Sequence, residues 1–264
     1  MTNTLVDRPH ALATLDARGI ATLTLRNAGV LNILSTPVIR DNTEALRTLA
    51  AREDVRAVVL QGESPRAFVA GADIAEMASL DGASARAFIS GLRDLCNAVR
   101  HFPAPVIACV PGWCLGGGME LAMACDLRVA SENAHFGMPE VKVGIPSVIH
   151  AALLPYLIGG ANTAWLLMMG ETIDAARALS WGLVNEVVPA GELDGAIDRM
   201  AGALAAMGPA AIRQQKKLLR AWEPAHIDDA IEATVAEFGA AFRTGEPQHF
   251  MNAFLERKAR EQRG

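Results

Sequence analysis

The most informative part of the chain is Pro105-Val-Ile-Ala-Cys-Val-Pro-Gly-Trp-Cys-Leu-Gly-Gly-Gly-Met-Glu-Leu-Ala122, because it predicts a buried strand, a glycine loop and a helix start in direct succession. The first backbone N–H groups of a helix lack intrahelical partners, and with the helix dipole behind them they can hold an anion. A tight turn that needs glycine only for its backbone angles is the alternative on this stretch alone. Nucleotide-binding fingerprints of the G-K-[S/T] or G-x-G-x-x-G type are absent from it.

A second turn of small residues lies earlier in the chain, in Ala67-Phe-Val-Ala-Gly-Ala-Asp-Ile74, and it also follows a predicted strand and precedes a helical pattern. Two such turns could each aim one backbone amide at the same oxygen. Loss of one donor of this kind costs an enzyme about 2.7–4 kcal/mol of transition-state stabilisation, so a converging pair would be a large part of a catalytic site. The sequence leaves open whether the two turns meet.

Strand and helix patterns alternate around these turns, which predicts an α/β fold. Residues 19–25 alternate apolar and polar side chains as a half-buried strand does, and residues 55–60 and 127–130 are short, β-branched strand candidates. Thr36 is predicted to cap a helix with Pro37 at its first position, and residues 83–100 and 119–125 are predicted helices. From about Gly195 onward the pattern is nearly all helical.

The composition is that of an ordinary soluble globular protein, and it excludes several classes. With 29 acidic against 24 basic residues the chain lacks the positive field that nucleic-acid binding needs. The four cysteines form no C-x-x-C pair, so buried free thiols are expected instead of a metal site, and with the absence of a secretory signal pattern they indicate the cytoplasm. Residues 151–170 are uncharged, but Pro155 and Gly159-Gly160 interrupt them, which predicts two buried helices around a turn and no membrane span.

Three segments in their order and spacing resemble the enoyl-CoA hydratase/isomerase, or crotonase, family: residues 67–74, residues 105–122 and Ala134-His-Phe-Gly-Met-Pro-Glu140. The resemblance runs from about Gly19 to Lys258. It implies that the amides of Ala72 and Gly117 polarise the thioester carbonyl of a coenzyme A substrate. It further implies that the coenzyme A site includes Arg66, Ala70, Ala72, Asp73, Ile74 and Gly117, with Phe254 of a neighbouring subunit touching the adenine.

Glu120 and Glu140 are the candidate acid–base pair. Taken singly, either is more often a solvated surface carboxylate. The resembled hydratases carry glutamates at both positions, which implies that one activates water for attack at the β carbon while the other supplies the α proton. One neutral and one ionised carboxyl suit that chemistry, and repulsion between two nearby carboxylates would raise the pKa of one of them.

The chain departs from the family pattern between Gly144 and His150, where the loop is shorter and bulkier than in many hydratases. This segment is expected to border the acyl pocket, so its change bears on substrate choice. His150 is either a new acid or base or an ordinary residue on the far side of the loop, and a Ser147–His150 hydrolytic pair lacks the G-x-S-x-G elbow. Lysine is also common in the family where this chain has Ala75 and Arg257. The basic run from Arg213 to Lys217 is predicted to be a solvated helix face.

The resemblance predicts a crotonase-like spiral of repeated ββα units over residues 1–195, followed by a C-terminal helical region, 196–264, that assembles trimers or hexamers. The predicted reaction is reversible addition of water to a 2-enoyl-CoA, with no metal and no cofactor beyond the coenzyme A of the substrate. The alternatives are double-bond isomerisation, decarboxylation or C–C hydrolysis of an acyl-CoA. A non-catalytic RNA-binding relative is a further alternative, against which the acidic balance argues.

Overall fold

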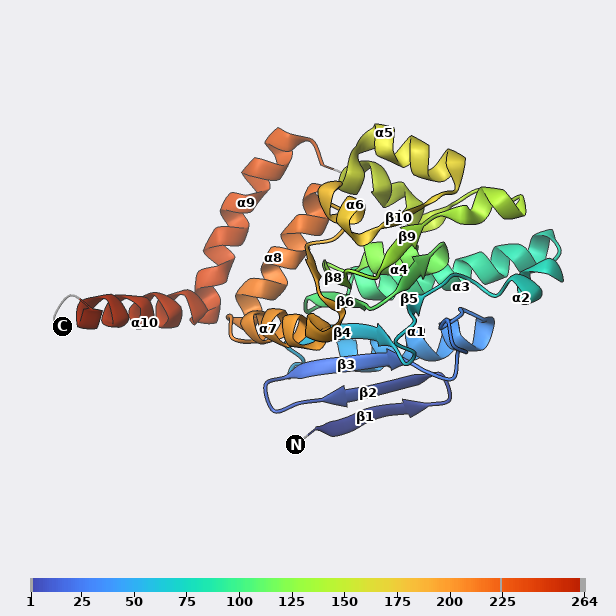
Figure 1. Ribbon diagram of the computed structural model, residues 1–264. Helices are drawn as coiled ribbons and strands as arrows, with labels where there is room; N and C mark the ends of the chain where they lie inside the picture. Colours follow the sequence, from blue (N-terminus) through green and yellow to red (C-terminus); the bar gives the residue numbers. More distant parts are fainter. Residues whose placement is uncertain (1, 224, 262–264) are drawn as a thin grey trace.

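The computed structural model describes residues 2–223 and 225–261, which form a body of two sheets covered by helices (Figure 1). The strands are β1 (Asn3–Arg8), β2 (Ala11–Leu15), β3 (Ile20–Leu25), β4 (Ala57–Gly62), β5 (Ala67–Val69), β6 (Val106–Val110), β7 (Trp113–Leu115), β8 (Leu127–Ser131), β9 (His135–Gly137), β10 (Thr172–Asp174) and β11 (Glu186–Val188). The α-helices are α1 (Thr36–Ala50), α2 (Ile74–Ala78), α3 (Gly82–Arg100), α4 (Gly117–Ala124), α5 (Leu154–Met169), α6 (Ala175–Ser180), α7 (Leu193–Ala205), α8 (Pro209–Trp222), α9 (Ile227–Ala241) and α10 (Glu246–Glu261). Short 3-10 helices are η1 (Pro139–Val143), η2 (Ile149–Leu153), η3 (Ala190–Glu192) and η4 (Phe242–Thr244).

The strands wind as a spiral between two sheets. The larger sheet has the order β1-β2-β3-β4-β6-β8-β11 and the smaller has the order β10-β9-β7-β5. Along the chain, β4, β6 and β8 enter the first sheet in parallel, and each is followed at once by β5, β7 or β9 in the second. A helix then follows each strand pair: α2 and α3, then α4, then η1. The predicted repeat of ββα units is confirmed.

The parallel strands are buried on both faces, which explains their nearly continuous apolar sequences. Val58 and Leu60 of β4 face the core beneath α1, α3 and α4, whereas Val59 faces the opposite side. On that opposite side α7 packs against Ile107 and Cys109 of β6. All four cysteines are buried free thiols, as predicted.

The predicted helices and strands are confirmed, with shifted ends. Six positions of α1 that show helical spacing are buried: Val38, Ile39, Asn42, Ala45, Leu46 and Leu49. The cap of α1 is Ser35, not Thr36, and the carboxylate of Glu76 accepts hydrogen bonds from the amide and hydroxyl of Thr36. Strand β4 begins two residues later than predicted, because its register against β3 runs from Ala57 to Gly62. Both shifts depend on contacts from distant parts of the chain.

The uncharged segment 151–170 bends where the sequence predicts a turn, but much of it is exposed. Gly159 has non-helical backbone angles (φ 76°, ψ 161°) within α5. By length and composition alone the helical segment Ile149–Met169 could cross a membrane. Within its most apolar part, 22% is buried inside the protein. Tyr156 and Met168 are 77% and 78% exposed, so the expectation that both helices are buried is wrong.

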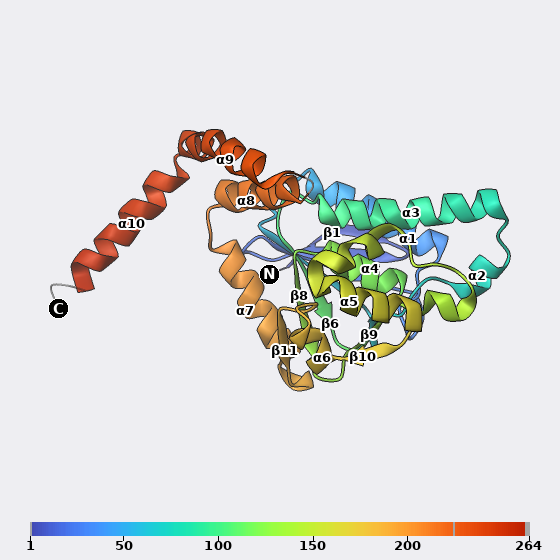
Figure 2. The same cartoon turned by 90° about the horizontal axis from the view of Figure 1, so that it is seen from above.

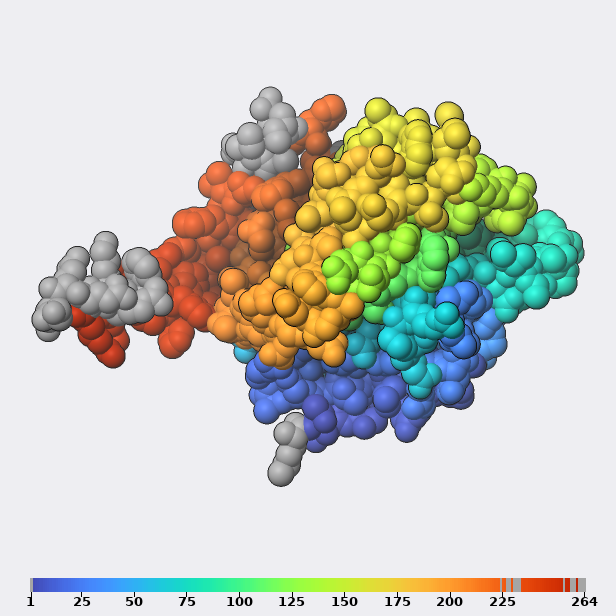
Figure 3. Space-filling model, viewed as in Figure 1, coloured from blue at the N-terminus to red at the C-terminus, as the bar shows by residue number. Residues whose placement is uncertain are grey.

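The C-terminal helices leave the body of the protein in succession. Helix α8 lies along the body, α9 packs beside α8, and α10 projects away from the body (Figures 1, 2 and 3). The predicted boundary after residue 195 falls inside α7, whose apolar face is part of the core. The division into a spiral core and an oligomerisation region stays a prediction.

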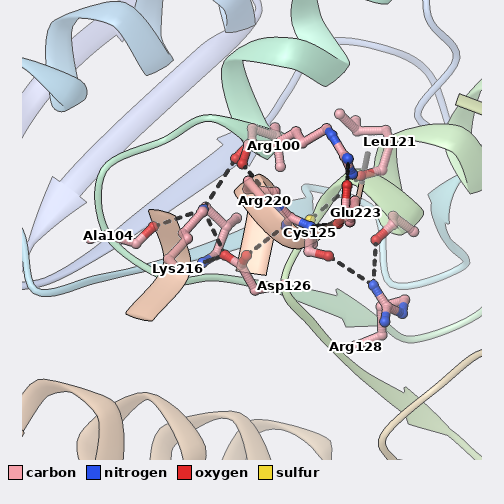
Figure 4. A network of polar contacts seen from close by, with 12 residues as sticks. Arg100, Ala104, Leu121, Cys125, Asp126, Arg128, Lys216, Arg220 and Glu223 are labelled. Atoms are coloured by element: carbon pink, nitrogen blue, oxygen red, sulfur yellow. Dashed lines mark hydrogen bonds and ion pairs between the residues drawn. The ribbon is translucent and has the colours of Figure 1, made fainter. Parts of the chain in front are cut away.

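A partly buried network of ion pairs attaches α8 to the spiral (Figure 4). Asp126, just before β8, accepts from Lys216 Nζ at 2.7 Å and from Arg220 at 2.8 Å, and Glu223 pairs with Arg100 at the end of α3. Lys216 is 6% exposed and also donates to the carbonyl of Ala104. The prediction that the run 213–217 is wholly solvated is therefore wrong at Lys216. A charged residue on an amphipathic helix can face the core when a buried carboxylate opposes it.

Replacing Asp126 with asparagine is expected to lower the free energy of unfolding by about 3 kcal/mol, because Lys216 and Arg220 would keep their charges without the carboxylate. Urea unfolding followed by circular dichroism measures the change. The matched control is Asp94→Asn, since Asp94 forms a surface pair with Arg93 and is expected to change stability by less than about 1 kcal/mol. Equal effects of the two substitutions would contradict the assignment.

Replacing Gly118 with alanine is expected to lower the free energy of unfolding by about 2–3 kcal/mol, because the added Cβ would lie 2.1 Å from the carbonyl oxygen of Val69. Gly195→Ala is the control, since that exposed helical glycine has nothing within 4 Å of an added Cβ. It should stabilise the protein by about 0.5–1 kcal/mol. Thermal unfolding of both variants decides the point, and a Gly118→Ala protein as stable as the wild type would count against it.

Candidate active site

A cavity of about 330 Å³ lies where the two small-residue turns meet helix α3 and the segment after β9. Its walls are mostly apolar: Phe88 and Leu92 of α3, and Val143, Ile145, Pro146 and Val148 of the altered loop. Glu120, Glu140 and Lys142 are the charged residues that line it. A largely apolar cavity with a few polar groups is the usual form of a small-molecule site.

The two turns touch at the level of the backbone. A Cβ added at Gly118 would lie 2.1 Å from the carbonyl oxygen of Val69, and a Cβ added at Gly116 would lie 4.0 Å from Gly71 Cα. Strand pairing between β5 and β7 brings this approach about, and only glycine leaves room for it. The convergence that the sequence left open is therefore present.

Each turn contributes a backbone amide without a partner among the described residues. Leu34 N donates to Gly71 O at 2.9 Å and Asp73 N donates to Leu34 O at 3.0 Å, so the N–H of Ala72 points away from Leu34. Gly117 is the first residue of α4, where no intrahelical acceptor exists. Ala72 and Gly117 both line the cavity. Two free donors from separate turns are the arrangement that an oxyanion site requires.

Glu120 is held inside the protein with its carboxylate at the cavity. The residue is 3% exposed, and its Oε1 accepts a hydrogen bond from Ala151 N at 3.0 Å. Burial raises the pKa of Glu120 to about 8; the Ala151 amide opposes the rise, and the charge of Glu140 adds to it. At neutral pH Glu120 is therefore mostly a neutral acid with a proton to donate.

Glu140 lies on η1, and its carboxylate rests against the glycine loop. Its Oε1 would be 2.7 Å from a Cβ at Gly116, whose φ of 50° is also a glycine conformation. Its Oε2 accepts a hydrogen bond from Ser147 Oγ at 2.9 Å. Burial raises the pKa of Glu140 above its usual range, while the Ser147 hydroxyl opposes that rise. The main cause of both shifts is burial, whereas the sequence had suggested mutual repulsion.

The predicted coenzyme A residues fall into three groups. Ala70 and Ile74 line the cavity with Ala72 and Gly117. Asp73 caps α2 by accepting from the amides of Ala75 and Glu76, and exposed Arg66 precedes β5 outside the cavity lining. Phe254 lies in α10, but its side chain is outside the described part of the structure.

The altered loop borders the cavity as expected, and His150 agrees with the interpretation as an ordinary residue on the far side of the loop. His150 is 7% exposed and does not line the cavity; burial lowers the pKa of its ring to about 4. Ser147 contacts Glu140, so it is no partner of a hydrolytic histidine. The contact joins residues seven positions apart, and no periodicity in the sequence indicates it. No group of three potential metal-binding side chains occurs within residues 2–223 and 225–261.

The ββα spiral, with two free amides and the carboxyl groups of Glu120 and Glu140 at one apolar cavity, is the architecture of the crotonase class of folds. The solved enoyl-CoA hydratase of Mycobacterium smegmatis superposes with a TM-score of 0.91 at 32% identity, covering 95% of this chain and 97% of that one. For the Bacillus anthracis enoyl-CoA hydratase the TM-score is 0.88 at 29% identity, over 97% and 96% of the two chains.

Sequence comparisons agree with the fold. The family described as enoyl-CoA hydratase/isomerase matches residues 16–263. The short-chain-enoyl-CoA hydratase of Clostridium acetobutylicum is 33% identical over 90% of this chain and 92% of its own length. The crotonyl-CoA hydratase of Syntrophomonas wolfei is 35% identical over the same shares. The chain belongs to the enoyl-CoA hydratase/isomerase family.

Glu120→Gln is expected to make the protein more stable than the wild type as the pH rises. The folded-state pKa of about 8 exceeds the ordinary value of 4.5, so unfolding releases a proton between these values and wild-type stability falls with rising pH. The free-energy difference between variant and wild type should grow by roughly 2–4 kcal/mol between pH 5 and pH 9. Urea unfolding at several pH values measures it, and a difference independent of pH would contradict the assignment.

Proposed function

We propose that the protein is an enoyl-CoA hydratase, which adds water reversibly across the 2,3 double bond of an enoyl-CoA thioester. The observation that carries this proposal is that the buried carboxyl group of Glu120, the half-buried carboxyl group of Glu140 and two free backbone amides line one cavity. Relatives at 33% and 35% identity over most of the chain bear the names of short-chain-enoyl-CoA and crotonyl-CoA hydratases, and they support the same activity.

In the proposed reaction the thioester carbonyl accepts hydrogen bonds from the amides of Ala72 and Gly117. These donors stabilise the negative charge that moves onto the carbonyl oxygen as a nucleophile attacks the β carbon. The positive end of α4 adds to the same effect at Gly117. In this proposal the two positioned amides are the groups that the protein supplies at the carbonyl oxygen.

Glu140 acts as the base and Glu120 as the acid in this proposal. Glu140 removes a proton from water while the water oxygen bonds to the β carbon, and Glu120 delivers its proton to the α carbon. The pKa of about 8 for Glu120 and the hydroxyl donor on Glu140 support this distribution of one proton over the pair. Because the charge of Glu140 adds to the raised pKa of Glu120, the pH–rate profile reports on the pair.

The proposed substrates have short, apolar acyl chains, since the cavity is small and its walls beyond the carboxylates are aliphatic or aromatic.

We also propose that Ala70, Asp73, Ile74, Arg66 and Phe254 belong to the coenzyme A site, with Phe254 supplied by a neighbouring subunit. Assembly into trimers or hexamers through residues 196–264, a cytoplasmic location and independence from metal or redox cofactors complete the proposal.

Glu120→Gln and Glu140→Gln are each expected to lower kcat for hydration by about 10²–10⁴-fold, because each removes one proton-transfer group. Loss of the enoyl-thioester absorbance with short and medium 2-enoyl-CoA substrates measures the rate. Glu53→Gln is the control, since Glu53 is exposed and does not line the cavity. The wild-type rate should also fall as the pH rises through about 8, where Glu120 loses its proton.

Failure of the wild-type protein to consume any 2-enoyl-CoA in such a panel would remove the hydratase proposal. Turnover of a 3-enoyl-CoA or of a β-diketone thioester in its place would identify one of the alternative acyl-CoA reactions on the same amides. Unchanged turnover in both glutamine variants would reject the acid–base assignment alone.

A further inference from the structure

One short segment holds both carboxyl groups. Ser147 Oγ donates to Glu140 Oε2 at 2.9 Å, and four residues later Ala151 N donates to Glu120 Oε1 at 3.0 Å. The two glutamates themselves come from separate elements, α4 and η1. Residues 144–151 therefore determine where the two carboxyls lie relative to each other.

The first half of this segment folds back onto η1. Gly144 ends η1 in the left-handed region (φ 82°), and Ile145 N donates to the backbone oxygen of Glu140 at 3.2 Å. Pro146 then fixes the backbone angle just before Ser147. These three features return the hydroxyl of Ser147 to a carboxylate seven positions earlier in the chain.

The second half is fixed by a constrained backbone. Ile149 has a φ of 38°, which a β-branched residue rarely adopts. Ala151 N, two residues later, is shared between Val148 O at 2.9 Å and Glu120 Oε1 at 3.0 Å. Such a conformation persists only where the surrounding structure determines it. Residues 144–151 are thus held in a single conformation at both ends of the segment.

Few other groups can orient Glu140. Its Oε1 faces Gly116, which has no side chain. Lys142 lines the cavity but pairs with Glu171 at 2.9 Å, and the remaining charged group of the lining is Glu120. Among the described residues, Ser147 is the side chain that hydrogen bonds to Glu140.

We propose that Ser147 is a positioning residue for the proposed hydration. Its hydroxyl holds the ionised carboxylate of Glu140 against Gly116 and fixes its position relative to the carboxyl group of Glu120. A hydrogen bond donated to the ionised form favours that form, so the hydroxyl keeps the base ready at neutral pH. The inference rests on the proposed function for its kinetic consequence, but the contact itself is independent of it.

The test compares Ser147→Ala with Ser147→Thr, which keeps the hydroxyl, and with Ser180→Ala, which removes a hydroxyl bonded to Arg177 O on exposed α6. Ser147→Ala is expected to lower kcat by about tenfold at neutral pH and to change KM by less than about twofold. The acidic limb of its pH–rate profile should move to higher pH, because Glu140 loses a donor. Ser147→Thr should restore most of the rate and the original limb.

An infrared titration separates this proposal from the proposed function. The carboxyl band that disappears in Glu140→Gln should titrate at higher pH in Ser147→Ala than in the wild type, whether or not the protein hydrates any thioester. Should Ser147→Ala fail to fold, Ser147→Cys replaces it, since a thiol is a weak donor of similar size. An unshifted band, or equal losses of rate in the alanine and threonine variants, would overturn the proposal.

Discussion

The contact on which the rest of the structure depends is the approach of the backbone at Val69 to the backbone at Gly118. A Cβ at Gly118 would be 2.1 Å from the carbonyl oxygen of Val69, and one at Gly112 would be 2.1 Å from that of Arg66. These two glycines let β5 and β7 pair closely enough for the following turns to share a cavity. The free amides of Ala72 and Gly117 then face the same cavity, and backbone contacts alone determine their positions. A site built from backbone amides needs this precision, because the backbone has no rotamers with which to adapt.

Much of this arrangement can be predicted from the sequence, because short-range signals encode it. Apolar periodicity gives α1 and α3, β-branched runs give β4 and β6, and glycine at 116–118 predicts a close turn before α4. Glu120 and Glu140 are separated by 20 positions, and only the family resemblance pairs them. Their meeting at one cavity is a product of the spiral, in which β7 and β9 are neighbours.

The features that the sequence did not indicate all depend on contacts between distant positions. Lys216 lies in a basic run that looks solvated, yet it is buried because Asp126, 90 positions earlier, opposes it. Thr36 is not the cap of α1, because Glu76 binds its amide and hydroxyl. The charged groups differ in their partners: Asp126 pairs with two cationic side chains, whereas Glu120 accepts from the backbone and its pKa is raised by burial. The ion pairs of Asp126 attach α8 to the spiral, whereas Glu120 at the cavity has no cationic partner among the described residues.

The winding of the chain also divides the cavity by origin. The two amides belong to the turns after β5 and β7, where glycine contacts leave almost no substitution open. The loop after β9 supplies Ser147 and part of the apolar wall, and its Val143, Ile145 and Val148 are partly exposed to solvent. Substitutions in residues 143–148 can therefore change the shape of the cavity and the contact to Glu140 without disturbing the amides of Ala72 and Gly117. One architecture of this kind can diversify its chemistry through a single exposed segment.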